Sequence, residues 1–360
     1  MSNDNKKNIK FSLFSDFHYL RGEYVNSLGD LHKILHRAND ANVDFVLQAG
    51  DFCQNRYESP ELDKAFLSNE YGLPVYGIYG NHDMERHSKD GKNCMALITP
   101  LLTNDKEVVW GTADGKISPD GSIGYYYFQK NGFRIVCLDT NYSWNPTKKL
   151  WEHNRPASWG PPAGNERIDS LGPVQVSWLD EVLTDAAQKA IPCIVVSHIG
   201  FYVAKRNCPD ADAVKEIFAK VNKIHKGTVI MAISGHWHTH NVRFEDNVFY
   251  LQMNTTRCAT ECYANRDRPA HYPDELVYDI FVGYDENGNE LFESQRINSA
   301  DRGNSSWVYT DALNGIVTVT EDGNITIDGM ETDWLGGVLP PWQNEYLKPY
   351  VTSGEWSIEI

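Results

Sequence analysis

Short apolar runs alternate along this chain with segments of helical periodicity, and this alternation limits the folds that it can adopt. The runs are rich in Val, Ile, Phe and Tyr and have the length of buried strands. They are 9–14 (IKFSLF), 43–48 (VDFVLQ), 74–79 (PVYGIY), 133–138 (FRIVCL), 192–197 (PCIVVS) and 228–234 (TVIMAIS). Between them, apolar residues recur at helical spacing in 28–38, 178–183 and 214–224. Strands that alternate with helices predict an α/β layered architecture.

Composition indicates a folded, acidic protein. The 360 residues, 41% of them hydrophobic, are enough for one large domain or two modest ones. The formal net charge of −16 argues against general affinity for nucleic acid or anionic membranes. We therefore expect no nucleic-acid polymer as a partner, and an anionic substrate needs a local positive centre.

The sequence predicts neither a membrane span nor a disulfide framework. No window resembles a transmembrane helix, and the N-terminal MSNDNKKN lacks the apolar core of a secretory signal, so we expect a cytoplasmic location. The seven cysteines are scattered, and we interpret them mostly as reduced, partly buried thiols. Cys258 and Cys262, four residues apart, could instead pair or bind a metal. The oligomeric state is left open.

Two segments depart from the alternating pattern. Residues 141–173 are too rich in Pro, Gly and Asn for regular structure and predict a long ordered loop. Beyond about Ser299 hairpin signals begin, and 315–329 (GIVTVTEDGNITIDG) has two alternating runs around Asp-Gly-Asn. The aromatic residues of this tail either pack it onto the core or bind a sugar or a partner.

Polar residues able to bind metal stand where successive apolar runs end. They are Asp16 and His18, Asp51, Asn81 with His82 and Asp83, His198, and His236 with His238. Five strands thus aim side chains at one edge of a sheet, where open α/β folds place their ligands. Each fragment alone is typical of a turn or a capped residue, whereas the ordered set of five predicts a functional site.

The last of these sets belongs to an unusual run of histidines, SGHWHTHN at 234–241. In an extended segment, alternation places His236, His238 and His240 on one side, so at least two ring nitrogens can converge on one point. A metal ion is a candidate for that point.

The residue types indicate which metals the set would hold. Carboxylate, amide oxygen and neutral imidazole suit manganese, iron or zinc, and the absence of thiolates argues against a structural zinc site. So many protein groups exceed what one catalytic ion that must keep a position open can use. They suit two ions about 3.5–4 Å apart, which clamp a phosphoryl group and generate hydroxide near neutral pH. Two such ions also supply the positive charge that the surface lacks.

With this set, the sequence resembles the calcineurin-like metallophosphoesterase superfamily, whose ordered signature is D-x-H, GD-x-x-D, GNH(D/E), a later H and GH-x-H. The match spans about Ile9 to Asn254. The resemblance implies two packed mixed β-sheets flanked by helices, a four-layer sandwich. We place the catalytic domain at 9–298 and a C-terminal β-rich appendage, packed on the core, at 299–360. Looser similarities are to the manganese-dependent ADP-ribose and CDP-alcohol diphosphatase branch and to the cyclic nucleotide phosphodiesterase branch.

The resemblance also implies roles for individual residues. One metal would be bound by Asp16, His18 and His238, the other by Asn81, His198 and His236, with Asp51 bridging both. His82 would contact the scissile phosphate and help to protonate the leaving oxygen. A hydroxide that bridges the metals would attack phosphorus in line.

The chain departs from the signature at GDFCQ, where Gln54 stands in place of a second Asp that orients the catalytic histidine in many members. What partners His82 therefore stays open. Asp83 is one candidate, and the alternative is that Asp83 is a plain turn or cap residue.

Substrate contacts are candidates only. Those near the motifs are Asn55, Arg56, Tyr57, His87 and His240. Arg56 and Arg155 could bind a second phosphate, and Trp151 or Trp159 could stack a base or a sugar. The alternative for each is a solvated arginine or a tryptophan that anchors a loop. His240 continues the alternation, but the signature does not require it.

The sequence thus predicts a dinuclear metal-dependent phosphoesterase that hydrolyses phosphodiester or pyrophosphate-type bonds of a small phosphorylated molecule. Its cofactors would be two divalent or mixed-valence ions of manganese, iron or zinc. The alternatives are a phosphomonoesterase on the same site and a noncatalytic metal-binding scaffold on the same fold.

Overall fold

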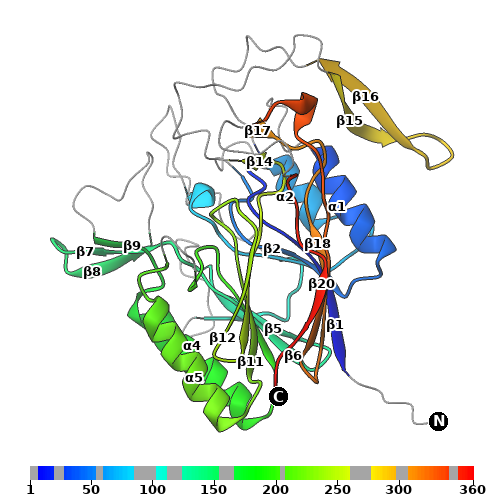
Figure 1. Cartoon of the computed structure of the whole chain (residues 1–360). Helices are drawn as coiled ribbons and strands as arrows, with labels where there is room; N and C mark the ends of the chain where they lie inside the picture. The colour runs from blue at the N-terminus through cyan, green and yellow to red at the C-terminus, as the bar shows by residue number, and fades with distance from the viewer. Residues whose placement is uncertain are drawn as a thin grey trace, which may run out of the picture.

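The computed structural model describes residues 7–19, 28–53, 60–84, 103–111, 124–153, 166–202, 207–259, 277–296, 307–339 and 348–360. Within them, two mixed β-sheets pack face to face and helices cover the outer face of each sheet (Figure 1). The predicted fold class, two packed mixed sheets flanked by helices, is confirmed.

The first sheet has six strands in the order β20-β19-β18-β1-β2-β3. Their bounds are β1 Asn8–Phe14, β2 Phe45–Gln48, β3 Val75–Gly77, β18 Gly315–Thr320, β19 Asn324–Asp328 and β20 Gly354–Ser357. β1, β2 and β3 run parallel to one another, whereas β18 pairs antiparallel with β1 and places Val317 opposite Phe11.

The tail therefore contributes strands to the first sheet. The hairpin predicted at 315–329 is confirmed as β18 and β19, and it extends the sheet at the β1 edge. The tail aromatics Trp307, Tyr309 and Trp334 are buried in the core between the sheets, which favours the packing role over a binding role. The domain division at 299 stays a prediction.

The second sheet has seven strands in the order β12-β13-β11-β10-β6-β5-β4. Their bounds are β4 Val109–Trp110, β5 Tyr126–Lys130, β6 Phe133–Cys137, β10 Cys193–Val196, β11 Val229–Ser234, β12 Asn241–Glu245 and β13 Val248–Gln252. β6, β10, β11 and β13 are parallel, and the other pairings are antiparallel. All six apolar runs predicted from the sequence thus form strands of the two sheets.

Aromatic side chains hold the two sheets together. Tyr76 of the first sheet stacks on Phe128 of the second with ring centroids 3.5 Å apart, and Phe45 meets the same Phe128 ring edge-on at 5.3 Å. Such pairs bury large apolar areas and add a directional preference. The edges of the two sheets are therefore fixed relative to each other, which matters for the side chains that follow the strands.

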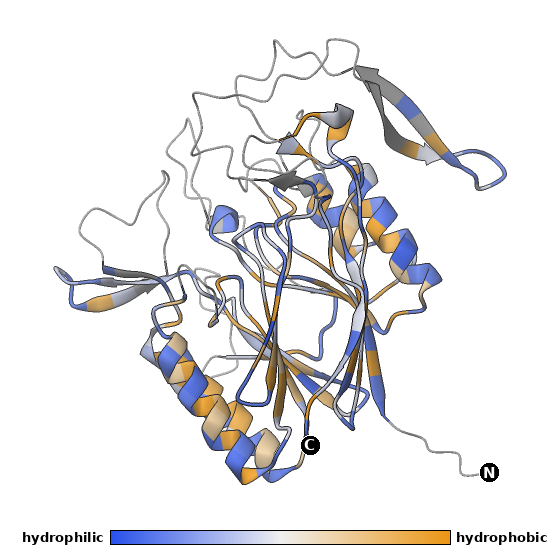
Figure 2. Ribbon diagram, viewed as in Figure 1, coloured by the Kyte–Doolittle hydropathy of each residue, from blue (hydrophilic) through white to orange (hydrophobic). Residues whose placement is uncertain are grey.

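In the described ranges, four helices cover the outer faces, with their apolar sides turned toward the sheets (Figure 2). They are α1 Leu28–Asp40 and α2 Pro60–Leu67 on the first sheet, and α4 Gly172–Gln188 and α5 Ala211–Ile224 on the second. The three predicted helical segments lie in α1, α4 and α5. α2 was not predicted, although its proline at the first position is typical of a helix start. No helix in the described ranges has the length and apolar character to cross a membrane.

The expectation of a long loop without regular structure at 141–173 was wrong. This segment contains a three-stranded sheet of β7 Tyr142–Asn145, β8 Leu150–His153 and β9 Glu166–Ser170. Trp144 lies opposite Trp151 across β7 and β8, with rings 5.9 Å apart, and cross-strand aromatic pairs stabilise such sheets. Asn145 Oδ1 accepts hydrogen bonds from the backbone N–H groups of Thr147 and Lys148, and these bonds stabilise the turn between β7 and β8.

The remaining elements lie outside the two large sheets. β14 Cys258–Ala259 pairs with β17 Trp307–Val308, β15 Val277–Tyr284 forms a hairpin with β16 Glu290–Arg296, and two 3₁₀ turns are η2 His82–Met84 and η5 Leu335–Gly337. Four cysteines are buried free thiols, as predicted: Cys53, Cys137, Cys193 and Cys208. Cys262 lies outside the described residues, so its pairing with Cys258 stays open.

Candidate metal centre

The candidate site lies where five parallel strands of the two sheets end. Asp16 and His18 follow β1, Asp51 follows β2, and Asn81 and His82 follow β3, all from the first sheet. His198 follows β10, and His236 and His238 follow β11, from the second sheet. These residues come from the edges of two sheets, so the expectation of a single sheet edge was wrong. All eight residues are buried except His236, which is half-buried.

One group of side chains joins the end of β1 to the end of β11. One potential ligand atom from each of Asp16, His18 and His238 lies within 4.8 Å of the other two. His238 Nε2 is 3.2 Å from Asp16 Oδ1 and 2.9 Å from His18 Nε2. Two imidazole nitrogens and a carboxylate thus converge on one point.

A second group joins the ends of β2, β10 and β11. Ligand atoms of Asp51, His198 and His236 also lie within 4.8 Å of one another, and His198 Nε2 is 3.1 Å from Asp51 Oδ2. The other ring nitrogen of His198, Nδ1, donates to the backbone carbonyl of Ala49 at 2.9 Å. That bond makes Nδ1 a protonated nitrogen and turns Nε2 toward Asp51, the orientation that such a bond gives to metal-binding histidines.

Asp51 lies between the two groups. Its Oδ2 is 3.8 Å from His18 Nε2 of the first group, and Asp16 Oδ1 of the first group is 3.9 Å from His198 Nε2 of the second. The two groups are therefore neighbours that share the space around one carboxylate. Asn81, which is buried, directly precedes His82 at the same edge.

The histidine run between β11 and β12 is not extended, so the expected alternation on one side was wrong. His236 and His238 have φ values of 73° and 53°, in the left-handed region. Turning the chain in this way sends His236 toward Asp51 and His238 toward Asp16. His240 leaves the site and packs its ring 5.3 Å from that of Tyr350.

Backbone strain marks the same residues. Left-handed φ is uncommon outside glycine and is found at functional sites, where the surrounding structure holds it in place. The non-glycine residues with this conformation include five of the candidate ligands: Asp16, His18, Asp51, His236 and His238. Gly50, before Asp51, has a φ of 97°, and a Cβ built on it would lie 2.2 Å from His198 Nδ1. Only glycine at position 50 therefore permits the His198 imidazole to lie so close to the end of β2.

The electrostatics of the site suit cations. Burial alone would raise the pKa of Asp16, but His238 and His198 lower it to about 2. The pKa of Asp51 is likewise held well below its usual range against burial, by His198 and His82. For His198, burial is outweighed by Asp51 and Asp16, which raise the pKa to about 10. The two carboxylates thus remain charged and attract positive charge.

Two of the imidazoles stay neutral. Burial lowers the pKa of His18 to about 3, and burial together with His198 lowers that of His236 to about 3. Neutral imidazole and ionised carboxylate are the forms that bind metal, because the ligand lone pair must be free. The donor set therefore fits divalent ions that accept nitrogen and oxygen.

Asp83 has a structural role in the turn around η2. Its carboxylate accepts the backbone N–H groups of Gly80 at 2.8 Å, Cys53 at 2.9 Å and Phe52 at 3.2 Å. These bonds tie the segment after β3 to the segment after β2. These bonds fit the turn role of Asp83, and the partner of His82 stays a prediction.

This geometry agrees with a match to a protein family. The model of the calcineurin-like phosphoesterases matches residues 9–240, more than half of the chain. The chain belongs to the calcineurin-like phosphoesterase family. The membership predicted from the sequence is confirmed.

Two relatives of this phosphoesterase are informative. The manganese-dependent ADP-ribose/CDP-alcohol diphosphatase of Xenopus tropicalis is 22% identical over 214 residues, which are 51% of this chain and 62% of the relative. The chain thus aligns with less than two thirds of that protein. The crystal structure of a dimetal phosphatase from Danio rerio superimposes with a TM-score of 0.50 and 14% identity, over 91% of this chain and 98% of the other. That likeness shows the shared fold.

Some predicted contacts lie outside the described residues, and some contacts were missed. Gln54, Asn55, Arg56, Tyr57, His87, Arg155 and Trp159 lie outside the described ranges. Sequence reasoning missed Ser15, whose hydroxyl donates to Asp16 Oδ2 at 2.6 Å, and Thr255, whose hydroxyl donates to the Asp16 carbonyl at 2.8 Å. Serine and threonine are so common beside motifs that the sequence alone does not indicate that they hold a metal ligand in place.

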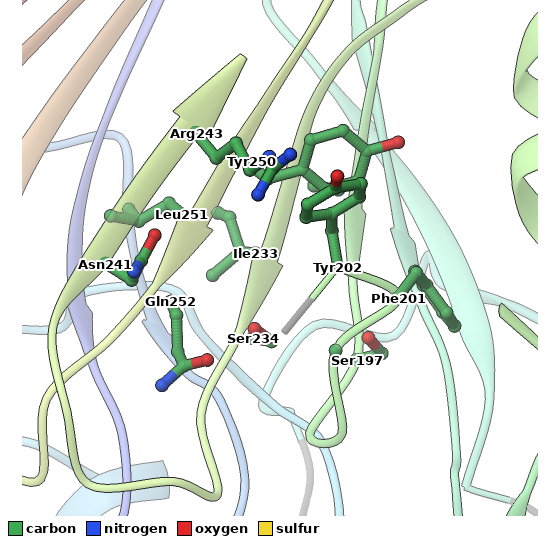
Figure 3. Close-up of a pocket in the computed structure, with 12 residues that line it drawn as sticks. Ser197, Phe201, Tyr202, Ile233, Ser234, Asn241, Arg243, Tyr250, Leu251 and Gln252 are labelled. Carbon is green, nitrogen blue, oxygen red and sulfur yellow. The ribbon is translucent and has the colours of Figure 1, made fainter. Parts of the chain in front are cut away.

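A pocket lies beside the strand ends of the second sheet (Figure 3). Ser197 and Ser234, which line it, are close in sequence to His198 and His236. Its wall is aromatic and cationic: the Arg243 guanidinium lies 3.9 Å from the centre of the Tyr202 ring, which is 5.5 Å from that of Tyr250. The phosphoesterase thus has a concave surface that the sequence analysis did not single out.

Proposed function

We propose that this phosphoesterase is a dinuclear enzyme that hydrolyses phosphodiester or pyrophosphate-type bonds of a small phosphorylated molecule. The observation that carries the proposal is the position of Asp51, whose Oδ2 lies 3.1 Å from His198 and 3.8 Å from His18. One carboxylate between two convergent groups is the arrangement needed to bridge two ions.

The proposed ligand assignment combines these groups with the order of ligands in the family signature, which adds Asn81. Asp16, His18 and His238 would hold one ion, Asn81, His198 and His236 the other, and Asp51 would bridge both. The mixture of imidazole, carboxylate and amide oxygen suits manganese, iron or zinc. Manganese is favoured because the Xenopus relative is manganese-dependent. Bound there, two divalent ions would supply positive charge to the phosphoryl oxygens and would lower the pKa of a water for attack on phosphorus.

His82 would act as the proton donor. One of its ring nitrogens lies within 4.8 Å of ligand atoms of His18 and Asp51, so it is within reach of a phosphoryl group held at the centre. An imidazole N–H in that position can protonate the leaving oxygen near neutral pH. Its backbone N–H donates to Asp51 Oδ1 at 2.7 Å, which fixes the position of the residue relative to the bridging carboxylate.

The substrate class is supported by two observations. The net charge of −16 provides no general attraction for polyanions, which favours a small substrate bound through the centre itself. The Xenopus relative is a diphosphatase of ADP-ribose and CDP-alcohols, and both substrate classes contain a pyrophosphate link. For this chain we propose only the type of bond, a pyrophosphate link, and not those particular substrates.

The test is hydrolysis by protein stripped with a chelator and then reconstituted with manganese. We expect metal-dependent turnover of bis-p-nitrophenyl phosphate and of ADP-ribose, with two manganese ions per chain by elemental analysis. Turnover of p-nitrophenyl phosphate alone would indicate a phosphomonoesterase instead. Two bound ions without turnover of any of the three compounds would contradict the enzyme proposal and favour the scaffold.

A further inference from the structure

A second cluster of potential metal ligands lies between helix α1 and the hairpin β15–β16, at the edge of the molecule (Figure 1). One potential ligand atom from each of His32, His36 and Glu290 lies within 4.8 Å of the other two. His32 and His36 are four residues apart on α1, so their side chains project from the same face of the helix. None of these residues belongs to the candidate metal centre.

The distances within this cluster fit a small tetrahedral ion. Glu290 Oε1 is 2.9 Å from His32 Nε2 and 3.5 Å from His36 Nδ1. Around zinc, with bonds of about 2.0–2.1 Å to nitrogen and oxygen, tetrahedral ligand atoms lie about 3.3 Å from one another. Small movements of the side chains, of which those of His36 and Glu290 are at least partly exposed, would therefore bring three ligands to bonding distance.

The other ring nitrogen of each histidine already faces a carboxylate. His32 Nδ1 is 2.5 Å from Glu70 Oε1, and His36 Nε2 is 3.2 Å from Asp40 Oδ2. Histidines that bind metal typically donate their second N–H to a carboxylate, which fixes the tautomer and raises the basicity of the ligand nitrogen. This pattern occurs twice here, and both remaining nitrogens point to the same glutamate.

Charge supports the same conclusion. Three carboxylates, those of Asp40, Glu70 and Glu290, surround the two imidazoles, and His32 is 5% exposed. Among the described residues, Glu70 and Glu290 form ion pairs with histidines only, and no lysine or arginine joins them. A divalent cation would offset this partly buried negative charge.

We propose that His32, His36 and Glu290 bind a divalent cation, with zinc as the best fit, and that this ion joins the hairpin β15–β16 to helix α1. Two imidazoles and one carboxylate are zinc ligands, and the Tyr71 hydroxyl, 3.1 Å from His36 Nδ1, or a water completes four-coordination. Glu70 and Asp40 hold the imidazoles in the binding tautomer. This site is separate from the proposed dinuclear centre and does not depend on it.

The test compares zinc content in the full chain after chelator treatment and dialysis against Zn²⁺. His36→Asn and Glu290→Gln change residues that are partly exposed, so the fold should tolerate them. His225→Asn is the matched control, because it removes an exposed histidine at the end of α5, distant in sequence from the cluster. We expect one zinc equivalent fewer in each cluster variant than in the wild type and in His225→Asn.

Two further readouts separate this site from the dinuclear centre and from a plain network of ion pairs. Glu70→Gln should weaken zinc binding at this site by about 10–100-fold, as loss of a carboxylate behind a histidine ligand does. Manganese-dependent hydrolysis of bis-p-nitrophenyl phosphate should be unchanged in the cluster variants. Equal zinc content in all the proteins would show that the cluster is only a set of ion pairs and would overturn the proposal. Loss of zinc together with the manganese-dependent activity would overturn the separate site.

Discussion

The carboxylate of Asp51 accepts the backbone N–H of His82 at 2.7 Å, so the proposed bridging ligand also positions the proposed proton donor. Oδ1 makes this bond, which leaves Oδ2 to face His198 and His18. Because the bond uses the backbone of His82, changes to the imidazole and changes to the carboxylate should have different effects.

Asp51→Asn should lower the metal content and abolish activity. The substitution removes the negative charge shared by the two groups while it keeps the size of the side chain. We expect binding of fewer than two manganese ions per chain at saturating metal, with loss of hydrolysis that added manganese does not restore. Elemental analysis after dialysis measures the first effect. Retention of two ions at wild-type affinity would contradict the bridging role.

His82→Gln should leave the metal content nearly intact and slow turnover by about 10²–10⁴-fold, the usual contribution of a general acid. The backbone N–H still reaches Asp51, so the bridging carboxylate keeps its position. The drop should appear in kcat for substrates with poor leaving groups and should shrink for p-nitrophenolate, which needs little protonation. Wild-type kcat with a poor leaving group would remove the acid assignment.

Asp83→Ala should destabilise the fold more than it changes the chemistry. The substitution leaves the backbone N–H groups of Gly80, Phe52 and Cys53 without their acceptor, at about 1–3 kcal/mol for each buried donor that finds no other partner. Urea unfolding measures the free energy lost. If Asp83 instead set the pKa of His82, the pH profile of kcat in Asp83→Asn would shift, and we expect it to stay in place.

Part of this architecture could be predicted from the sequence, because the periodicity of apolar residues in strands and helices reflects which side chains are buried. The six apolar runs became strands of the two sheets, and the polar residues after five of them met at one site, since parallel strands end at the same edge. The periodicity of apolar residues does not indicate which strands belong to the same sheet. The distribution of the strands over two sheets, and the pairing of β18 with β1, depend on long-range contacts.

The misses have local physical causes. Alternating histidines at 236–240 suggested an extended chain, yet positive φ at His236 and His238 separates their side chains, and such strain is imposed by the tertiary structure. In 141–173, the prolines and glycines indicated a loop, although the segment forms strands in which Trp144 lies opposite Trp151. The cluster of His32, His36 and Glu290 could not be predicted, because Glu290 is 254 residues from His36 and lies on another element.

Gly50→Ala should damage the metal centre specifically. Gly50 has a φ of 97°, and its new methyl group would lie 2.2 Å from His198 Nδ1, within the ring that faces Asp51. Either His198 is displaced or the end of β2 moves, and in both cases the second group of ligands is disrupted. We expect binding of one of the two manganese ions to weaken by at least tenfold and activity to fall with it.

Gly72→Ala is the matched control for the backbone cost alone. Gly72 also has a positive φ, of 64°, but a Cβ there meets nothing within 4 Å. Its alanine variant should lose about 1 kcal/mol of stability while it binds two ions and keeps full activity. Equal loss of metal in the two variants would show that the effect arises from general destabilisation, whereas loss in Gly50→Ala alone establishes that the close approach of Gly50 to His198 positions the second metal ligand group.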